Sequence, residues 1–346
     1  MTSSTGKRSS NIELLRILSM FMVLVLHANF LGIGAPTTQD CITAPGNAFL
    51  RFFLESLSIG ATDVFVLISG WFGIKPSLKK FIALVFQVLF ITFSILIIFY
   101  IINGRSAISP KSVLRLFMVT KGYWFIKSYL CLYILSPVLN YFAENAPKNT
   151  FKLVLMGFFA FQTIYGWTDS APEFYYGYST LSFIGLYLLA RYLRLYPVRA
   201  LSNRRLCLIT YFASSLFITL AIWGLMKMDF HTDYAILIVF SYINPIIILS
   251  SLALLFTFNN IEIPLSKTIN WIASSVFAVY IIHTNEFVMG PYRSAVWYLY
   301  SSYPVVLRSL LILLFLSLVF ISCVFFDKIR LFVWGKLLNA YERRRK

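Results

Sequence analysis

Long, uninterrupted apolar runs restrict the fold of this chain more than any other feature of its sequence. The runs are about 17 to 25 residues long, and they do not alternate between polar and apolar residues as barrel strands do over about 10 residues. Ten candidate spans lie near residues 12–32, 49–72, 78–102, 123–141, 151–168, 177–195, 206–226, 234–257, 271–290 and 304–326. We therefore predict an all-α membrane protein, a polytopic bundle of about ten transmembrane helices.

The composition excludes a soluble globular protein. Of the 346 residues, 59% are hydrophobic and 12% are charged, whereas soluble domains carry roughly 25% charged residues. The four cysteines lie far apart, which indicates neither a disulfide framework nor a metal site. Because no internal repeat or linker marks a second domain, we expect one integral membrane domain over residues 1–346.

The excess of basic residues predicts the orientation of the chain. Lys and Arg outnumber Asp and Glu by 30 to 13, a net charge of +17. Cytoplasmic loops of membrane proteins collect such residues, so a nucleic-acid partner is not expected. With ten spans, most basic loops lie on the side of both termini, which predicts cytoplasmic N- and C-termini. Residues 103–122 are basic yet fall outside, so they are either an amphipathic interfacial segment or a sign of a wrong count.

Ionisable side chains inside apolar spans are costly and are candidates for function. The first span, NIELLRILSMFMVLVLHANF, contains Glu13, Arg16 and His27. On a helix, Arg16 and His27 share a face about 16 Å apart along the axis, and Glu13 lies one turn before Arg16. Arg16 is either an interfacial anchor or part of a site. His27 is either a buried, hydrogen-bonded histidine or a base that takes a proton from a hydroxyl.

The second span contains SIGATDVFVLISGWF, with Asp63 inside an apolar stretch. A carboxylate there should pair with a cation or be protonated, and no cation lies within one helical turn of it in sequence. Ser69 and Gly70 either permit close helix packing or contribute to a site.

Two further sets of residues have both an ordinary and a functional interpretation. Lys75, Lys79 and Lys80 either orient the chain or bind the phosphates of a soluble donor, although no glycine-rich phosphate loop accompanies them. Tyr123 and Trp124 either belong to an aromatic belt at the membrane boundary or contact a substrate.

The ninth span, SVFAVYIIHTNEF, places His283 and Glu286 three residues apart on one face of a predicted helix. In the functional interpretation the carboxylate orients the imidazole and selects its tautomer. In the ordinary interpretation both residues cap the helix in water at the outer interface.

Four stretches of this chain, in this order, resemble the acyltransferase-3 family of integral membrane acyltransferases: NIELLRILSMFMVLVLH, FVLISGWF, YWFIKSYLCLYILSPVLN and FAVYIIH. Within the family, this length resembles the O-acetyltransferases of bacterial envelope glycans. The resemblance implies transfer of an acyl group, usually acetyl from cytoplasmic acetyl-CoA, to a hydroxyl of an envelope glycan or lipid-linked saccharide at the outer face of the inner membrane. It implies acetyl-CoA as co-substrate, with no metal expected.

By this resemblance, Arg16 and His27 correspond to the family's essential pair, with Glu13 beside them. Where the family often has an arginine pair after the second span, this chain has Lys75, Lys79 and Lys80, which keep the charge but lose bidentate phosphate geometry. We expect the three lysines to bind the donor. The residues expected to bind substrate are Asp63, Ser69, Tyr123, Trp124, His283 and Glu286.

A transporter or flippase for a polar or lipid-linked saccharide is the alternative function, because intramembrane Arg, Asp and His also line translocation paths. The sequence shows no paired, Gly- or Pro-broken helices in corresponding halves, the usual pointer to a transporter site. A membrane receptor or scaffold is a third interpretation, in which Arg16 and His27 matter for stability and not for activity.

Overall fold

The computed structural model describes residues 9–104, 109, 113–114, 123–169, 171–228 and 232–343. Every regular element in these residues is helical, which confirms the predicted all-α class. Within them, six helices are long and apolar enough to cross a membrane, or seven if one bent pair counts as a single span. The chain is thus a multi-pass membrane protein, but the predicted number of about ten spans is not confirmed. Most of the basic segment 103–122 lies outside the described residues.

The helices divide into two compact units. Unit 1 comprises Met1–Pro76 and Trp124–Asn270, and unit 2 comprises Ser77–Tyr123 and Trp271–Lys346. The elements of unit 1 are α1 (Ser10–Leu26), η1 (His27–Ile33), α2 (Thr38–Thr43), α3 (Pro45–Ser58), α4 (Ala61–Phe72), α7 (Trp124–Asn145), α8 (Lys148–Phe161), η3 (Gln162–Thr168), η4 (Tyr175–Gly177), α9 (Thr180–Leu195), η5 (Arg199–Ser202), α10 (Arg204–Lys227), α11 (Thr232–Val239) and α12 (Pro245–Asn259). Those of unit 2 are α5 (Leu78–Asn103), α14 (Val276–His283), α15 (Glu286–Ser302) and α16 (Val305–Arg343), and α13 (Lys267–Ala273) spans the boundary. Whether the two units form one functional domain over residues 1–346 stays a prediction.

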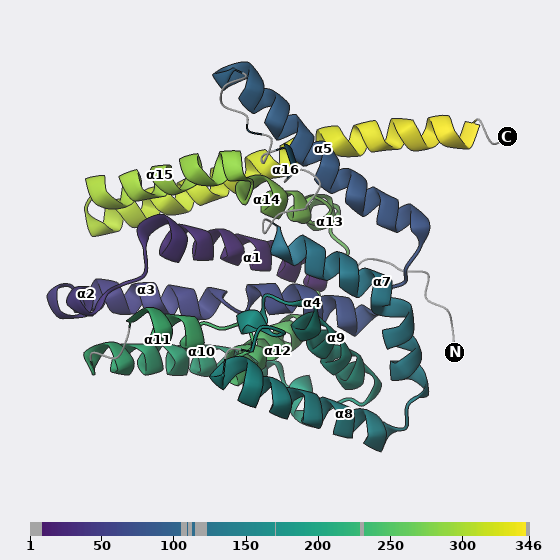
Figure 1. Ribbon diagram of the computed structural model, residues 1–346, viewed down its shortest axis with the longest axis horizontal. Helices are drawn as coiled ribbons and strands as arrows, with labels where there is room; N and C mark the ends of the chain where they lie inside the picture. Colours follow the sequence, from purple (N-terminus) through teal and green to yellow (C-terminus); the bar gives the residue numbers. More distant parts are fainter. Residues whose placement is uncertain are drawn as a thin grey trace. The chain divides into compact units, whose positions relative to one another are not determined.

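Unit 1 is a bundle in which α3 and α4 follow one another almost end to end alongside α1 (Figure 1). α4 also packs closely on α9, and α10 packs on both α3 and α12. Gly70 makes the approach of α4 to α9 possible, because a Cβ there would collide with the Tyr187 carbonyl oxygen and lie 2.9 Å from the Ala190 Cβ. The small residue at this position therefore serves helix packing.

Several of the predicted spans in unit 1 are interrupted helices. Residues 49–72 form α3 and α4 with a turn at Ile59–Gly60, and residues 234–257 form α11 and α12 with an irregular stretch over residues 240–244. Asn244 caps α12 by accepting a hydrogen bond from the Ile246 N–H. Caps and turns thus divide runs that are continuously apolar, although Pro45–Phe72 is still one candidate span of 28 residues. That paired breaks are missing from corresponding halves stays a prediction.

One more predicted span in unit 1 is shorter than the hydrocarbon core requires. α9 has 16 residues, whereas a straight crossing needs about 20. The run 151–168 consists of α8 followed by the π-helical η3 and is not among the candidate spans. These two runs and the divided run 234–257 account for the difference between ten predicted spans and seven, and the bent pair for that between seven and six.

Unit 2 contains the sharpest correction to the sequence analysis. The predicted ninth span is a pair of helical segments, Lys267–His283 and Glu286–Ser302, bent by 87°. Asn285 begins the second segment by accepting a hydrogen bond from the Phe287 N–H. His283 and Glu286 are therefore not on one face of one helix, because the helix ends at the first and restarts at the second.

A buried ion pair joins the long helices of unit 2. Arg330 donates to both carboxylate oxygens of Asp327 at 2.6 and 2.9 Å, and Gln87 of α5 donates to the same carboxylate at 3.2 Å. All three side chains are buried. This arrangement satisfies the Asp327 carboxylate within an apolar helix pair.

Candidate functional site

The first turn of α1 is fixed to the end of α12. The Asn11 side chain donates to the carbonyl oxygens of Phe258 and Ile261 at 3.0 and 2.9 Å, and the Ser10 hydroxyl accepts from the Ser266 N–H at 2.9 Å. These contacts hold the beginning of the helix that carries Arg16 and His27.

Glu13 and Arg16 lie together, as the sequence predicts. The Arg16 guanidinium donates to the Glu13 carboxylate at 3.1 Å. The Glu13 side chain is buried, whereas that of Arg16 is 36% exposed. The guanidinium is therefore held by its neighbour and still accessible to an anionic group.

His27 marks a change of helix type. α1 ends at Leu26, and residues His27–Ile33 form a π-helical segment. His27 itself has φ −71° and ψ −29°, so the helical phase between Arg16 and His27 is kept. Single π-helical turns inside α-helices are often found at functional sites. The imidazole is half-buried.

A cavity of about 170 Å³ opens beside His27. Its size corresponds to five or six water molecules, at about 30 Å³ each. The lining combines apolar and aromatic side chains with a few polar groups, which is typical of ligand sites. The residues that line it are Leu26, His27, Phe30, Leu31, Glu55, Ile59, Tyr176, Tyr178, Ile236, Leu237, Phe240, Ser241 and Tyr242.

A buried polar network stands behind this cavity. The Asn29 side-chain amide donates to the Glu55 carboxylate at 2.9 Å, and Arg51 Nε donates to the Asn29 side-chain oxygen at 3.0 Å. Arg51 also donates to the backbone oxygens of Asn29 and Gly34. All three side chains of the network are less than a tenth exposed.

The sequence analysis overlooked this network, although a signal was present. Arg51 and Glu55 lie four residues apart inside the apolar run 49–72, which places them on one face of a helix. Opposite charges at this spacing in a membrane span are candidates for function by the same reasoning as Arg16 and His27.

A strained loop forms another wall of the cavity. Tyr175 and Tyr176 have φ angles of 41° and 55°, which side chains rarely adopt, and Gly177 follows with φ 95°. The Tyr176 carbonyl oxygen accepts from the Tyr242 N–H at 3.1 Å and from the Ser241 hydroxyl at 3.2 Å. The irregular stretch between α11 and α12 thus holds this loop in place. Such strain is concentrated at ligand clamps and active sites.

Trp124, predicted to bind substrate, packs among the tyrosines of this cavity. Its ring lies 4.5 Å from that of Tyr178 and 5.8 Å from that of Tyr242. The Tyr178 and Tyr242 side chains are hydrogen-bonded to each other, and Tyr242 also bonds to Thr62. The structure therefore places Trp124 inside an aromatic cluster of unit 1.

Asp63 and Ser69 do not line the cavity. Asp63 is 1% exposed, its Oδ2 atom has no hydrogen-bond partner among the described residues, and it acts electrostatically on Tyr242. Ser69 donates to the Phe65 carbonyl oxygen at 2.9 Å and contacts the Tyr129 hydroxyl at 3.3 Å. The Ser69 hydroxyl thus makes contacts within α4 and to α7.

The remaining predicted substrate residues belong to unit 2. The Tyr123 hydroxyl donates to the Ile281 carbonyl oxygen at 3.1 Å and accepts from the Asn285 amide at 2.8 Å. His283 is fully buried, and its Nδ1 lies 2.6 Å from the Val279 carbonyl oxygen. Glu286 is exposed at the first position of α15. These residues gather at the 87° bend.

The lysines predicted to bind the donor are divided between the two units. Lys75 follows α4 in unit 1, whereas Lys79 and Lys80 lie in the first turn of α5 in unit 2, where Lys79 pairs with Glu342 at 3.3 Å. Other basic residues lie at the start of α10, where an open hollow of about 750 Å³ is lined by Arg199, Ser202, Asn203, Arg204, Arg205 and Leu208.

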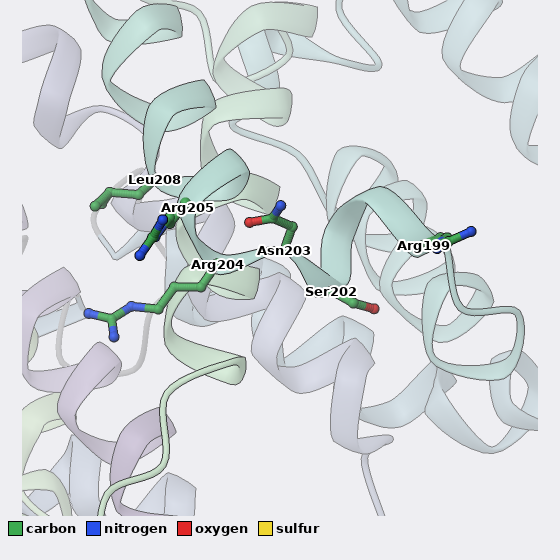
Figure 2. A pocket seen from close by; sticks show the side chains of 6 residues that line it. All are labelled: Arg199, Ser202, Asn203, Arg204, Arg205 and Leu208. Carbon is green, nitrogen blue, oxygen red and sulfur yellow. The ribbon is translucent and has the colours of Figure 1, made fainter.

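The arginines of that hollow do not converge. Figure 2 shows the Arg199 side chain pointing away from Arg204 and Arg205. All three residues are exposed, as is usual for charges that orient a membrane protein. Among the described residues, no group of three or more His, Cys, Asp and Glu side chains is arranged to hold a metal ion.

Comparison with known proteins adds one positive finding. A family model described as an acyltransferase domain matches residues 9–327, which includes the stretches of both units that carry the predicted motifs. Searches with the chain found no significant match among curated proteins or among solved structures.

Proposed function

The chain belongs to the acyltransferase-3 family of membrane acyltransferases, and from this premise we propose that it is an O-acyltransferase. The donor is a cytoplasmic acyl-CoA, with acetyl as the acyl group. The acceptor is a hydroxyl of an envelope glycan or lipid-linked saccharide at the outer face of a bacterial inner membrane. Both termini are cytoplasmic in this proposal.

One observation supports the proposal most strongly. α1 presents the accessible guanidinium of Arg16 near its start and the imidazole of His27 at its end, where the cavity lies. A charged donor cannot cross the hydrocarbon, so a site that bridges a cytoplasmic donor and an outer acceptor needs groups at different depths. Arg16 suits an anionic donor group, and His27 suits a hydroxyl.

The chemical step has two forms. As a general base, His27 takes the proton of the acceptor hydroxyl while the hydroxyl oxygen attacks the carbonyl carbon of the thioester. The C–S bond then breaks, and His27 passes the proton to the departing thiolate of CoA. As a nucleophile, the imidazole attacks the carbonyl carbon through its unprotonated nitrogen; the C–S bond breaks and the thiolate of CoA takes the N–H proton of the ring. The acceptor oxygen then attacks the acyl-imidazole, the C–N bond breaks, and the hydroxyl proton returns to the imidazole.

The donor phosphates are proposed to bind Lys75, Lys79 and Lys80. This proposal is supported by the positive charge of the three lysines and by their closeness in sequence. The exposed pairing of Lys79 with Glu342 costs little to break, because surface ion pairs contribute at most about 1 kcal/mol. Replacing all three lysines by glutamine is expected to raise the KM for acetyl-CoA, and the same change at Arg199, Arg204 and Arg205 provides the comparison.

Acyl transfer from radiolabelled acetyl-CoA into envelope glycan tests the proposed function. Membrane vesicles carry the wild type, His27→Ala or Arg16→Ala at matched expression. Label incorporation by the wild type and its loss in both variants is the expected result. No label above background from the wild type, with a competent glycan acceptor present, would overturn it.

A transporter or flippase for a saccharide is the second candidate, and the interrupted helices favour it. α3 and α4 meet at a turn, and α11 and α12 are separated by an irregular stretch that lines the cavity. Irregular backbone at membrane depth is tolerated where it lines a cavity, and transporters use it to bind substrate. Saccharide movement across vesicles in the absence of acetyl-CoA would favour this candidate.

A further inference from the structure

The cavity beside His27 contains a carboxylate that the proposed chemistry leaves without a role. Glu55 lies on α3, is 4% exposed and is among the residues that line the cavity. Asn29 donates a hydrogen bond to this side chain, and Arg51 acts on it electrostatically.

The network orients the Glu55 carboxylate and leaves it able to accept more hydrogen bonds. Asn29 donates one hydrogen bond at 2.9 Å, and Arg51 acts on the carboxylate electrostatically while holding Asn29. A carboxyl group has two oxygen atoms and can make several hydrogen bonds. The positions that Asn29 leaves open call for hydroxyl or amide groups in the cavity.

Glu55 and the tyrosine hydroxyls of the lining favour a neutral group with several hydroxyls, because each hydroxyl can both donate and accept a hydrogen bond. An acetyl thioester has only acceptor atoms and matches this polar lining less well.

Aromatic side chains supply the rest of the wall. Tyr176, Tyr178 and Tyr242 line the cavity, and Trp124 packs on the last two. Aromatic faces offer apolar area to a ring, while the tyrosine hydroxyls offer hydrogen bonds at its edge. The strained backbone at Tyr175–Tyr176 is a separate indication that this loop is shaped for a ligand.

We propose that this cavity is the acceptor subsite and that it binds a neutral pyranose ring, with Glu55 accepting from the ring hydroxyls and Tyr176 and Tyr178 contacting the ring. This inference rests on the proposed function, because it makes the ring the acceptor whose hydroxyl meets His27. Asn29 and Arg51 are positioning residues for Glu55.

Equilibrium dialysis of the purified full-length protein in nanodiscs tests the inference without acyl-CoA. The probes are tritiated methyl hexopyranosides of the gluco, galacto, manno and N-acetylgluco series. The variants are Glu55→Gln and Tyr178→Phe. Glu144→Gln is the matched control, because Glu144 is exposed on α7 and pairs with Arg191 at 3.0 Å.

The wild type and Glu144→Gln are expected to bind at least one glycoside saturably, and Glu55→Gln to bind it about 10- to 100-fold more weakly, because a buried polar group loses its hydrogen-bond partner. Tyr178→Phe is expected to weaken glycoside binding about three- to tenfold. This variant provides the test of the subsite if Glu55→Gln does not fold. Equal affinity of Glu55→Gln and wild type, no saturable binding of any glycoside by the wild type, or competition by acetyl-CoA for the bound glycoside would overturn the inference.

The same assay separates this inference from the proposed function. Glycoside binding that depends on Glu55, in a protein that transfers no acyl group, would overturn the function and leave the subsite standing. If the wild type transfers acyl groups but Glu55→Gln binds the glycoside as tightly as the wild type does, the proposed subsite is overturned and the proposed function is not.

Discussion

The two intramembrane histidines occupy opposite kinds of environment. His27 of unit 1 is half-buried, begins a π-helical segment and lines a cavity with the carboxylate of Glu55. His283 of unit 2 is 0% exposed, and its Nδ1 lies 2.6 Å from the Val279 carbonyl oxygen one turn earlier in the same helix. Tyr280 and Tyr292 pack around it.

This difference shows that a histidine in an apolar run is not by itself a sign of chemistry. A ring nitrogen committed to a backbone oxygen inside a packed helix serves structure. A half-buried ring that lines a cavity can reach a ligand in it. The carboxylates differ in the same way, since Asp327 has a bidentate partner and the Asp63 Oδ2 atom has none among the described residues.

The largest expected effect is the difference in acyl-transfer rate between alanine variants of the two histidines. His27→Ala should lower kcat for acyl transfer about 10²- to 10⁴-fold, as for loss of a general base, while the melting temperature in detergent stays close to that of the wild type. His283→Ala should leave kcat within a fewfold and destabilise the protein by about 1 to 3 kcal/mol, because it empties a packed position and removes a buried hydrogen bond. An equal loss of transfer in both variants would break the comparison.

Next in size is the contrast between the carboxylates. Asp327→Asn removes the charge that Arg330 faces and should destabilise unit 2 by about 3 to 5 kcal/mol, because the guanidinium is left buried and unpaired. Asp63→Asn should change stability by no more than about 1 kcal/mol, because Oδ2 has no hydrogen bond to lose. Thermal denaturation of both variants measures the difference, and a large loss for Asp63→Asn would reveal an ionic partner.

The third contrast concerns glycines. Gly177→Ala should destabilise the cavity loop by about 1 to 3 kcal/mol, because its φ of 95° disfavours a side chain and the new Cβ would lie 2.6 Å from that of Tyr242. Gly335→Ala in α16 meets nothing within 4 Å and should be neutral or stabilise by about 0.4 to 1 kcal/mol. The stability of both variants can be measured by limited proteolysis and by their melting temperatures. A stable, fully active Gly177→Ala protein would show that the loop tolerates the strain.

Much of the membrane architecture could be predicted from local signals. The first span, the class of the fold and the closeness of Glu13 to Arg16 follow from apolar runs and helical periodicity, and the structure has them. The number of spans did not follow. The break between α11 and α12 and the bend before Asn285 depend on caps and turns inside sequences that are largely apolar, so hydropathy does not reveal them.

The candidate site was predictable only in part. Arg16 and His27 were selected because ionisable residues in a membrane span are costly, and the same rule would have selected Arg51 and Glu55. Tyr176 and Tyr178 gave no such signal, because tyrosines near a membrane boundary are ordinary. Their importance comes from the left-handed backbone at Tyr175 and Tyr176 and from the contacts of Tyr176 and Tyr178 with Tyr242, more than 60 residues away in sequence.

By itself, the sequence determined that this chain is helical, crosses a membrane and carries a particular set of charges within its spans, because burial of apolar runs and the cost of buried charge act locally. The tertiary structure decided which of these charges meet. Asn29 of η1 meets Arg51 and Glu55 of α3, and the adjacent residues Tyr123 and Trp124 belong to different units. Whether a polar side chain is satisfied inside its own helix or opens onto a cavity is set by packing between distant segments, which no local pattern records.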